Sequence, residues 1–352
     1  MAYTNIDDPS AFFQTALYTG NGSSQSITND GNSDMQPDWV WVKSRSIAYH
    51  NVVFDSSRGV NNRLSTNLTA AEDTGGGYGT VSAFNSDGFS VSSGANTNNN
   101  SATYVGWQWK ANGGTTASNS DGNITSTVQA NTTAGFSIVT WTGNENSSAS
   151  VGHGLGVTPD LVMFKNRSSA YNWVVYLGAL GQTSGNNMFA YLNLTNAAEQ
   201  GAGITFTSSL LNPGSGATTN ASSMIAYCFN NVQGYSKFGS YVGNGVANNG
   251  PFVYLGFKPA FVMIKSTTTT GAHLIWDLKR SSFNLMDDII NAAEADAEST
   301  NGIYGIDVLS NGFKIMNTGA NNGTNQSGTK YVYYAFAENP FTTSTGIPTT
   351  AR

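Results

Sequence analysis

The chain has 352 residues, only 10 % of them charged, and a formal net charge of −6. This acidic balance argues against a protein that binds nucleic acid or an anionic membrane, because both attract basic surfaces. The single cysteine, Cys228, excludes an intrachain disulfide framework and a cysteine-rich metal site, and we expect a small buried thiol there.

Residues 1–15 form a lead-in, in which Asp8 and Pro9 predict one short helical turn. The lead-in shows neither the basic region nor the apolar core of a secretory signal, and no apolar run in the chain is long enough to span a membrane. Abundant Gly, Asn, Ser and Thr suit polar turns, and 12 % aromatic residues suit strands. We therefore expect a soluble all-β protein made in a cytoplasm.

Similar sequence patterns return three times along the chain. They predict three tandem antiparallel β-sandwich repeats, jelly-roll or lectin-like, at residues 16–110, 136–233 and 237–341. Five or six strands in about 100 residues match the size of one small sandwich. Residues 111–135 are predicted to be a linker, and residues 342–352 a polar tail.

Each repeat contains a strand that opens with proline and closes with lysine, at residues 37–43, 159–165 and 259–265. Four consecutive apolar residues predict that each strand is buried on both faces, and we expect the closing lysine to return to solvent. Trp39 and Trp41 share one face of the first strand, where aromatic rings can stack on sugars. Because the later copies exchange them for other apolar residues, we predict core packing instead.

The polar segment after the next strand looks helical only in the third copy, at residues 285–297. The sequences Ser-Asp-Gly at 86–88 and Ser-Asn-Gly at 310–312 predict two-residue hairpin turns. The second copy lacks such a turn and has residues 203–206 in its place.

The last strand of each repeat, at 104–110, 224–230 and 331–337, alternates between two faces. One face carries a β-branched residue and then two aromatic residues: Val105, Trp107 and Trp109; Ile225, Tyr227 and Phe229; Val332, Tyr334 and Phe336. We expect these rings to point into the core of each unit.

Loops rich in Asn, Gly and Thr precede these last strands. Polar, uncharged loops can adapt their hydrogen bonding to a glycan. The candidate surface or glycan-contact residues are Asn96, Asn98, Asn99, Asn100, Asn321, Asn322 and Asn325.

No catalytic, cofactor-binding or metal-binding residues are predicted. His50, His153 and His273 are far apart, so a metal site would need separate repeats to converge. The acidic loop at 30–34 places oxygen ligands at alternate positions, but it lacks the glycine at the sixth position and the acid at the twelfth position of a helix-flanked calcium loop. The loop at 119–123 shows the same alternation, and a polar turn is the favoured interpretation of both loops.

The spacing of residues along the chain also gives no support for an anionic-sugar site or a catalytic motif. Basic residues recur at strand ends, as in Lys43 and Arg45, where a solvated end or a subunit contact is favoured over an anionic-sugar site. The chain has no nucleophile-elbow, zinc-protease or phosphate-binding motif. Carboxylates are numerous enough for a glycosidase pair, but no spacing singles out two of them.

Several phrases resemble an uncharacterised repeat family in predicted structural and tail-associated proteins of tailed bacteriophages, many of them marine. These phrases are LYTGNG at 17–22, GFSIV at 135–139, VGHGLG at 151–156, GYSKFG at 234–239 and YAFAENPF at 334–341. The resemblance covers nearly the whole chain. It implies a virion component, assembled in the host cytoplasm, and it supplies no catalytic residues.

The expected function is therefore a non-enzymatic structural protein on the virion surface, associated with the tail or fibre or decorating the capsid, and contributing to host adhesion. The expected partners are other virion subunits and a host surface glycan, with neither nucleic acid nor membrane. A homo-oligomer is expected, and a trimer would match the threefold symmetry of many virion appendages. The alternatives are a carbohydrate-binding receptor module and a polysaccharide depolymerase.

Overall fold

The computed structural model describes residues 3–144, 146, 148–183, 186–201, 204–214, 221–300, 302–317 and 323–349. Nearly all regular structure in these residues is antiparallel β-sheet. The short helices among them are η1 (Pro9–Ala11), η2 (Gly76–Tyr78), α1 (Ala95–Asn98) and η3 (Gly178–Leu180). In the described part of the chain, no helix has the length and apolar character needed to cross a membrane.

The first sandwich, residues 13–109, pairs a large and a small sheet. The large sheet has the order β1 (Phe13–Thr19), β8 (Thr103–Trp109), β3 (Trp39–Ser44), β4 (Val52–Asp55) and β5 (Leu64–Ser65). The small sheet has the order β2 (Gln25–Ile27), β7 (Phe89–Val91) and β6 (Val81–Phe84). The hairpin from β6 to β7 confirms the turn predicted at 86–88.

The second sandwich, residues 117–229, has the largest sheet. Its order is β15 (Gln182–Thr183), β16 (Asn186–Tyr191), β14 (Val174–Leu177), β13 (Leu161–Asn166), β20 (Ser223–Phe229), β11 (Phe136–Thr142), β10 (Ser126–Asn131) and β9 (Ala117–Asn119), with β17 (Glu199–Gln200) beside β16. The small sheet is β12 (Val151–Gly152), β19 (Leu210–Pro213) and β18 (Ile204–Phe206). The linker prediction for 111–135 was therefore wrong, because β9 and β10 extend this sheet.

The third sandwich, residues 236–340, repeats the same plan. Its large sheet has the order β21 (Ser236–Val242), β29 (Lys330–Pro340), β23 (Phe257–Ser266), β24 (His273–Asp277), β25 (Asp288–Asn291) and β26 (Ser299–Thr300). Its small sheet is β22 (Phe252–Tyr254), β28 (Gly312–Ile315) and β27 (Ile306–Leu309), and the hairpin from β27 to β28 confirms the turn at 310–312.

Two local predictions need correction. The helix expected at 285–297 is wrong, because strand β25 occupies its centre. Ile289 there packs inside the third sandwich and Ile290 packs on the opposite side of the sheet, so burial on two faces outweighs helix propensity. The second sandwich does keep a hairpin, from β18 to β19. Thr207 closes its turn by accepting hydrogen bonds from the backbone N–H groups of Ser209 and Leu210.

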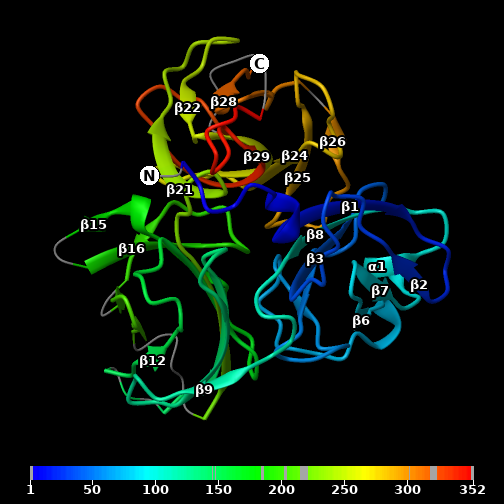
Figure 1. Ribbon diagram of the computed structural model, residues 1–352, viewed down its shortest axis with the longest axis vertical. Helices are drawn as coiled ribbons and strands as arrows, with labels where there is room; N and C mark the ends of the chain where they lie inside the picture. The colour runs from blue at the N-terminus through cyan, green and yellow to red at the C-terminus, as the bar shows by residue number, and fades with distance from the viewer. Residues whose placement is uncertain are drawn as a thin grey trace.

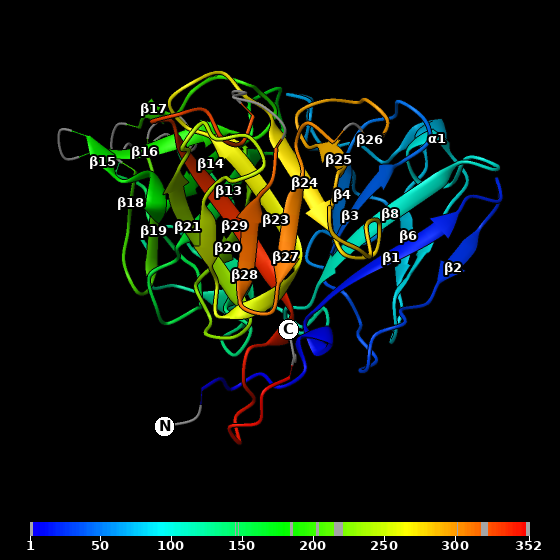
Figure 2. The same cartoon turned by 90° about the horizontal axis from the view of Figure 1, so that it is seen from above.

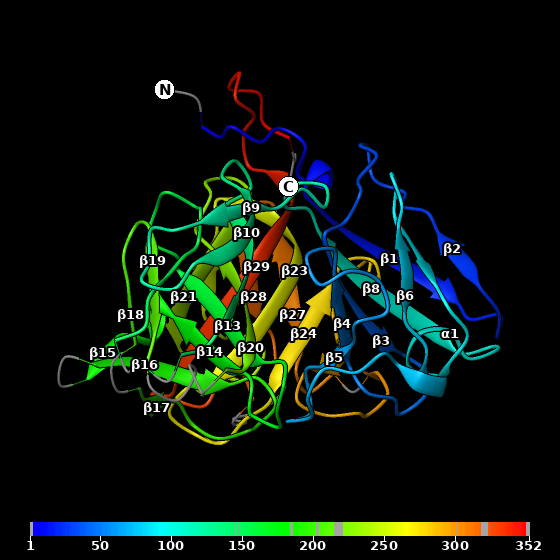
Figure 3. The same cartoon turned by 90° about the horizontal axis from the view of Figure 1, so that it is seen from below.

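The three large sheets contain one strand order, β1-β8-β3-β4, β11-β20-β13-β14 and β21-β29-β23-β24, and the second sheet continues past β11 with β10 and β9. Figure 1 shows the sandwiches as three lobes around a common centre, the first in blue, the second in green and the third in yellow to red. The two ends of the chain lie on the same side of the molecule (Figures 2 and 3), where Ser344 donates a backbone hydrogen bond to Asp7.

The aromatic faces of the last strands do not fill the separate sandwiches as expected; they meet in one central core. Trp39 stacks on Tyr227 at a centroid distance of 4.5 Å, and Phe336 contacts both Trp109 and Phe229. Only a void of about 10 Å³ is left among these rings, no more than about one water molecule needs. The core placement of Trp39 and Trp41 is thus confirmed, but the core belongs to three sheets together.

The opposite faces of the large sheets pack against the small sheets. Tyr18, Val40, Phe54 and Phe89 form the inner core of the first sandwich, and equivalent clusters fill the other two. Each large sheet is therefore buried on both sides, which explains the uninterrupted apolar runs of β3, β13 and β23.

Candidate functional site

The loop asparagines proposed as glycan contacts include two that are structural. Asn98 accepts a hydrogen bond from the backbone of Asn21 at 2.9 Å and donates one to the Asn21 side chain at 3.1 Å. Asn325 makes the same pair of bonds with Asn244, at 2.9 and 3.0 Å. Both side chains are completely buried, so they fasten the loop to the Gly-Asn turn after the first strand of the sandwich.

The other predicted asparagines differ in how far their side chains are buried. Asn96 is also buried, whereas Asn99 is half-buried and donates to the Tyr49 hydroxyl. Asn100 is exposed at the loop tip, so it is the most accessible of the five that the structure describes. Asn321 and Asn322 lie outside the described residues.

A buried tyrosine holds the loop before the last strand in two of the three sandwiches. Tyr104 accepts a hydrogen bond from the backbone of Asn99 at 2.8 Å and donates one to Ala95 at 2.7 Å. Tyr331 likewise accepts one from the backbone of Gln326 at 2.9 Å. The loops of the first and third sandwiches are thus fixed from beneath.

Met224 takes the place of this tyrosine in the second sandwich. It pairs with Asn166 of β13, just as Tyr104 pairs with Ser44 of β3 and Tyr331 with Ser266 of β23. A thioether has no hydroxyl with which to hold the loop.

A cavity of about 400 Å³ opens beside Met224. Phe164, Val174, Ile204, Pro213 and Met224 supply apolar lining, Tyr171, Phe189 and Tyr191 supply rings, and Asn166, Asn172 and Gln200 supply amides; Lys165 and Gly201 complete it. The size falls within the range of small-molecule sites, and apolar walls with a few polar groups are their usual lining. We call this the Met224 cavity.

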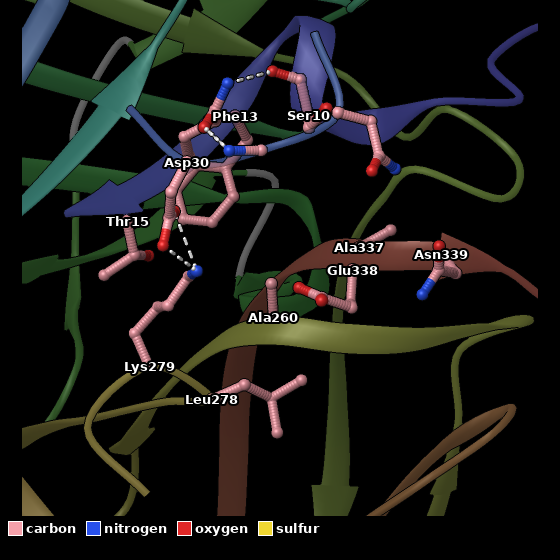
Figure 4. Close-up of a pocket in the computed structure, with 13 residues that line it drawn as sticks. Ser10, Phe13, Thr15, Asp30, Ala260, Leu278, Lys279, Ala337, Glu338 and Asn339 are labelled. Atoms are coloured by element: carbon pink, nitrogen blue, oxygen red, sulfur yellow. Dashed lines mark hydrogen bonds and ion pairs between the residues drawn. The ribbon is translucent and has the colours of Figure 1, made fainter. Parts of the chain in front are cut away.

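A second, smaller cavity of about 210 Å³ lies between the first and third sandwiches (Figure 4). Lys279 and Asp30 form an ion pair across it at 2.8 Å. Gln14 organises its edge by accepting from the backbone of Gly31 and donating to Ser33. Lys279 and Asp30 neutralise each other and are exposed to solvent, and Glu338 adds a further carboxylate to the lining, so we read it as a groove of the interface between sandwiches.

The strand-end lysines do not return to solvent as expected. Lys43, Lys165 and Lys265 are buried, and each ammonium donates to backbone carbonyls of another sandwich: Lys43 to Ala295, Lys165 to Thr69, and Lys265 to Thr195 and Asn196. The contacts form a closed cycle, from first to third, third to second and second to first sandwich. Burial lowers the pKa of each lysine to about 8.

An ionic network joins the first and second sandwiches. Arg58 is buried and bonds to both Asp55 and Glu72, while Arg167 bonds to Glu72 from the other side at 2.8 Å. Tyr227 donates to Asp55 at 2.7 Å. The neighbouring carboxylates raise the pKa of Arg58 although its burial acts in the opposite direction.

The same network recurs between the first and third sandwiches. Arg280 bonds to Asp277 at 2.5 Å and to Glu298 at 2.9 Å, and Arg45 bonds to Glu298 at 2.7 Å. At the junction of the second and third sandwiches, Leu177 stands where the others have the aspartate, and Leu180 where they have the buried arginine. Arg45 and Arg167 thus form contacts between sandwiches of one chain, whereas the sequence predicted a solvated strand end or a contact to a neighbouring subunit.

The histidines are not brought together. His50 is half-buried and bonds to Asn67, His153 is buried and bonds to Thr207, and His273 is buried with no hydrogen bond to either ring nitrogen among the described residues. In the described part of the chain, no three His, Cys, Asp or Glu side chains are grouped as metal ligands. Cys228 is buried as predicted, and burial raises the pKa of its thiol.

Comparison with known proteins gives one match. A family model described as a domain of unknown function, DUF7483, matches residues 8–340. No curated protein and no solved structure matches the chain.

Proposed function

The chain belongs to the DUF7483 domain family, and from that premise and its own residues we propose that it is a non-enzymatic structural protein of a tailed-phage virion. In this proposal it is assembled in the host cytoplasm and exposed on the particle, either on the tail or fibre or as a capsid decoration. Its partners are other virion subunits, and it contributes to host adhesion.

The observation that supports this proposal most is the core shared by all three sandwiches. Moving one sandwich away from the others would expose the rings of Trp39, Tyr227 and Phe336 to water, which is strongly unfavourable. The buried lysines and ionic networks add contacts that only the assembled arrangement satisfies. The result is a rigid three-lobed body, as a surface component of a particle requires. The phage-like phrases of the sequence support the location.

We also infer that the three sandwiches are tandem copies of one lectin-like unit. The large sheets share a four-strand order, and the buried lysines occupy the same place in each. Pairing of β1 with β8 and of β2 with β7 resembles a jelly roll, although β4 stays beside β3.

Mass spectrometry and gel densitometry of purified particles test this function. A few copies per virion support a tail position, and hundreds support a capsid decoration. Absence of the protein from purified particles overturns the proposal. Turnover of host polysaccharide by the purified protein would establish a depolymerase instead.

Homo-oligomerisation, with a trimer as the simplest case, is a separate part of the proposal. The mass of the purified protein in solution tests it. A monomer would mean that the three lobes supply a threefold outline within one chain (Figure 1).

A carbohydrate-binding module is the second candidate, and the Met224 cavity favours it. Rings, amides and an apolar floor occur together there. Aromatic faces and amide groups are suited to the apolar faces and hydroxyl groups of sugars.

A further inference from the structure

Strand β1 lies at the free edge of the first large sheet. The backbone N–H of Gly20, just beyond β1, donates to Ala102, and hydrogen-bonded pairs alternate along antiparallel strands. The N–H groups of Thr15, Leu17 and Thr19 therefore point away from β8. In the described part of the chain no strand pairs with that side of β1, and an edge of this kind is a template for pairing with another chain.

The matching edge of the second sandwich is covered by β10. Ile138 of β11 pairs with Tyr227 as Thr15 pairs with Trp107, so Ile138 and Thr15 are counterparts. On its other side Ile138 pairs with Gln129 of β10. The fold thus accommodates an antiparallel strand at this edge, opposite the position of Thr15.

The Gln129 side chain enters the junction between the first and second sandwiches, where it is completely buried. Its amide nitrogen donates to the hydroxyl oxygens of Ser56 and Ser57, at 2.9 Å in both cases. Its amide oxygen accepts from the backbone N–H groups of Asn112 at 3.1 Å and Gly114 at 2.9 Å. One side chain of the added strand therefore joins its sandwich to the neighbouring one.

The groove between the first and third sandwiches is the counterpart of the space that Gln129 fills. Leu278 and Lys279 take the places of the two serines, since each pair directly follows the buried aspartate of its sandwich. Thr15 lines the groove from the side of β1, and its Oγ1 is buried without a hydrogen-bond partner among the described residues. A buried hydroxyl in that state indicates a missing partner.

The third sandwich satisfies its corresponding edge with its own side chains. Phe238 of β21 pairs with Tyr334 and so corresponds to Thr15. Its backbone N–H donates to Oδ1 of Asn231 at 2.7 Å, and its ring packs in the central core. Among the three matching edges, as far as the structure describes them, the edge of β1 alone has neither a strand nor a side chain bonded to this N–H group.

The charge of the groove selects the side chain that can enter it. Lys279 is paired with Asp30 at 2.8 Å, whereas the Glu338 carboxylate forms no ion pair with any described residue. Figure 4 shows Glu338 turned towards the same space as Lys279. Two carboxylates against one ammonium leave the groove negative, and the Thr15 hydroxyl adds an acceptor. Lysine or arginine is therefore favoured over glutamine, and over glutamate most of all.

We propose that β1 accepts an antiparallel strand from a different protein subunit, with a lysine or arginine opposite Thr15 whose charged group enters the groove. In strand addition the backbone bonds supply affinity and the side-chain pockets supply specificity. A second copy cannot provide this strand by pairing β1 with β1, because β1 contains no basic residue. The inference rests on the proposed assembly with other virion subunits and names the edge at which one of them binds.

The test uses the full chain labelled with ¹⁵N and a capped peptide that has the sequence of residues 123–131 with the change Gln129→Lys. The peptide is titrated to about 5 mM, enough to fill most of a site whose Kd is about 1 mM. The amide signals of Thr15, Leu17 and Thr19 should shift saturably, while that of Phe238, at the satisfied edge, stays unchanged. Absence of a saturable shift at β1 overturns the proposal.

Two N-methylated peptides show whether the backbone of the peptide pairs with β1. In β10 the N–H of Thr127 faces β11 and the N–H of Val128 faces β9. Methylation at the position of Thr127 should abolish binding, because it removes a donor to β1. Methylation at the position of Val128 should leave binding unchanged, and equal effects of the two would contradict strand addition.

The charge preference tests the groove. The lysine peptide should bind at least about tenfold more tightly than a peptide with Gln129→Glu. The protein variant Glu338→Gln should lose most of this preference, while Glu199→Gln, an exposed carboxylate of the second sandwich, should keep it. An unchanged Phe238 signal verifies folding of both variants.

Equal preference in the two protein variants would remove the basic side chain from the groove and overturn its assignment. None of these measurements depends on whether the protein occurs in particles. Absence from virions with intact peptide binding contradicts the virion proposal alone, and presence in virions without peptide binding contradicts the edge proposal alone.

Discussion

The indole Nε1 of Trp107 donates a hydrogen bond to Oδ2 of Asp277 at 3.0 Å, joining the first sandwich to the third across 170 residues of sequence. The Tyr227 hydroxyl makes the same contact with Asp55 between the second sandwich and the first. An aromatic donor on the last strand of one sandwich thus meets an aspartate at the end of β4 or β24 in another. Each aspartate also neutralises a buried arginine three residues later.

Asp277→Ala should destabilise the protein by about 3–5 kcal/mol, because it leaves the Arg280 guanidinium buried without its nearest carboxylate. Trp107→Phe should cost less, about 1.5–3 kcal/mol, for one hydrogen bond to a charged group. Urea unfolding followed by tryptophan fluorescence and circular dichroism measures both. Equal losses for the two variants would contradict the view that the aspartate mainly serves the arginine.

The buried lysines predict a rise in stability at alkaline pH. Burial lowers the pKa of Lys265 to about 8, from 10.5 for a free lysine. Between these values the unfolded chain binds more protons than the folded chain, so the free energy of unfolding increases as pH rises from about 8 towards 10. Lys265→Met should flatten this increase.

The alkaline gain should end near pH 10. Burial raises the pKa values of Tyr235 and Tyr334, so the folded chain keeps phenol protons that the unfolded chain loses above its value of 10.0. Stability then falls with further increase in pH. Chemical unfolding at a series of pH values tests both limbs, and a flat profile from pH 8 to 10 would contradict the assignment.

His273 predicts the behaviour in acid. Burial, and then the charge of Lys265, hold the pKa of this imidazole well below 6.5. As pH falls below 6.5 the unfolded chain takes up a proton that the folded chain refuses, so stability present above 6.5 is lost progressively. Replacement by Leu should reduce this slope, measured as the urea midpoint between pH 7 and about pH 5. A slope as steep as that of the unmodified chain would show that other groups are responsible.

The asparagine loops can be divided by mutation into structural and exposed positions. Asn98→Ala should cost about 1–3 kcal/mol, because it removes the buried amide that bonds to both the backbone N–H and the side chain of Asn21. Asn100→Ala should change stability by no more than about 0.5 kcal/mol, since the side chain lies in solvent. Thermal unfolding compares the two, and similar melting temperatures would contradict the role given to Asn98.

Unfolding of the whole chain should be one cooperative transition. The central core takes its rings from all three sandwiches, so no sandwich can unfold without uncovering apolar surface of the other two. Calorimetry should give equal calorimetric and van't Hoff enthalpies. Two or three resolved transitions would show that the sandwiches are independently stable.

The sequence predicts where the strands and turns of this fold lie better than it predicts which sheet or sandwich each strand packs against. Alternation in β8 shows that Trp107 and Trp109 share a buried face, but a period of two cannot tell whether that face meets its own small sheet or another sandwich. Lys265 illustrates the same limit. A strand-end lysine is usually solvated, and here two of its acceptors are carbonyls about 70 residues away.

The cavity, in contrast, left a signal in the sequence. Met224 aligns with Tyr104 and Tyr331 when the three last strands are superimposed, and loss of a phenol ring is visible in that alignment alone. The alignment could not show whether a cavity forms at this position. Neighbouring side chains can close such a space, and the structure shows that Phe189, Tyr191 and Pro213 instead line an open cavity.

Joining three sandwiches in one chain has an evolutionary consequence. In an assembly of three identical subunits every substitution appears three times, so a vacant ring position would open three holes at once. A covalently joined triplet escapes that constraint: one lobe can acquire a new task while the other two preserve the shared framework. Leu177 and Met224, both in the middle lobe, are two positions at which that lobe differs from the other two.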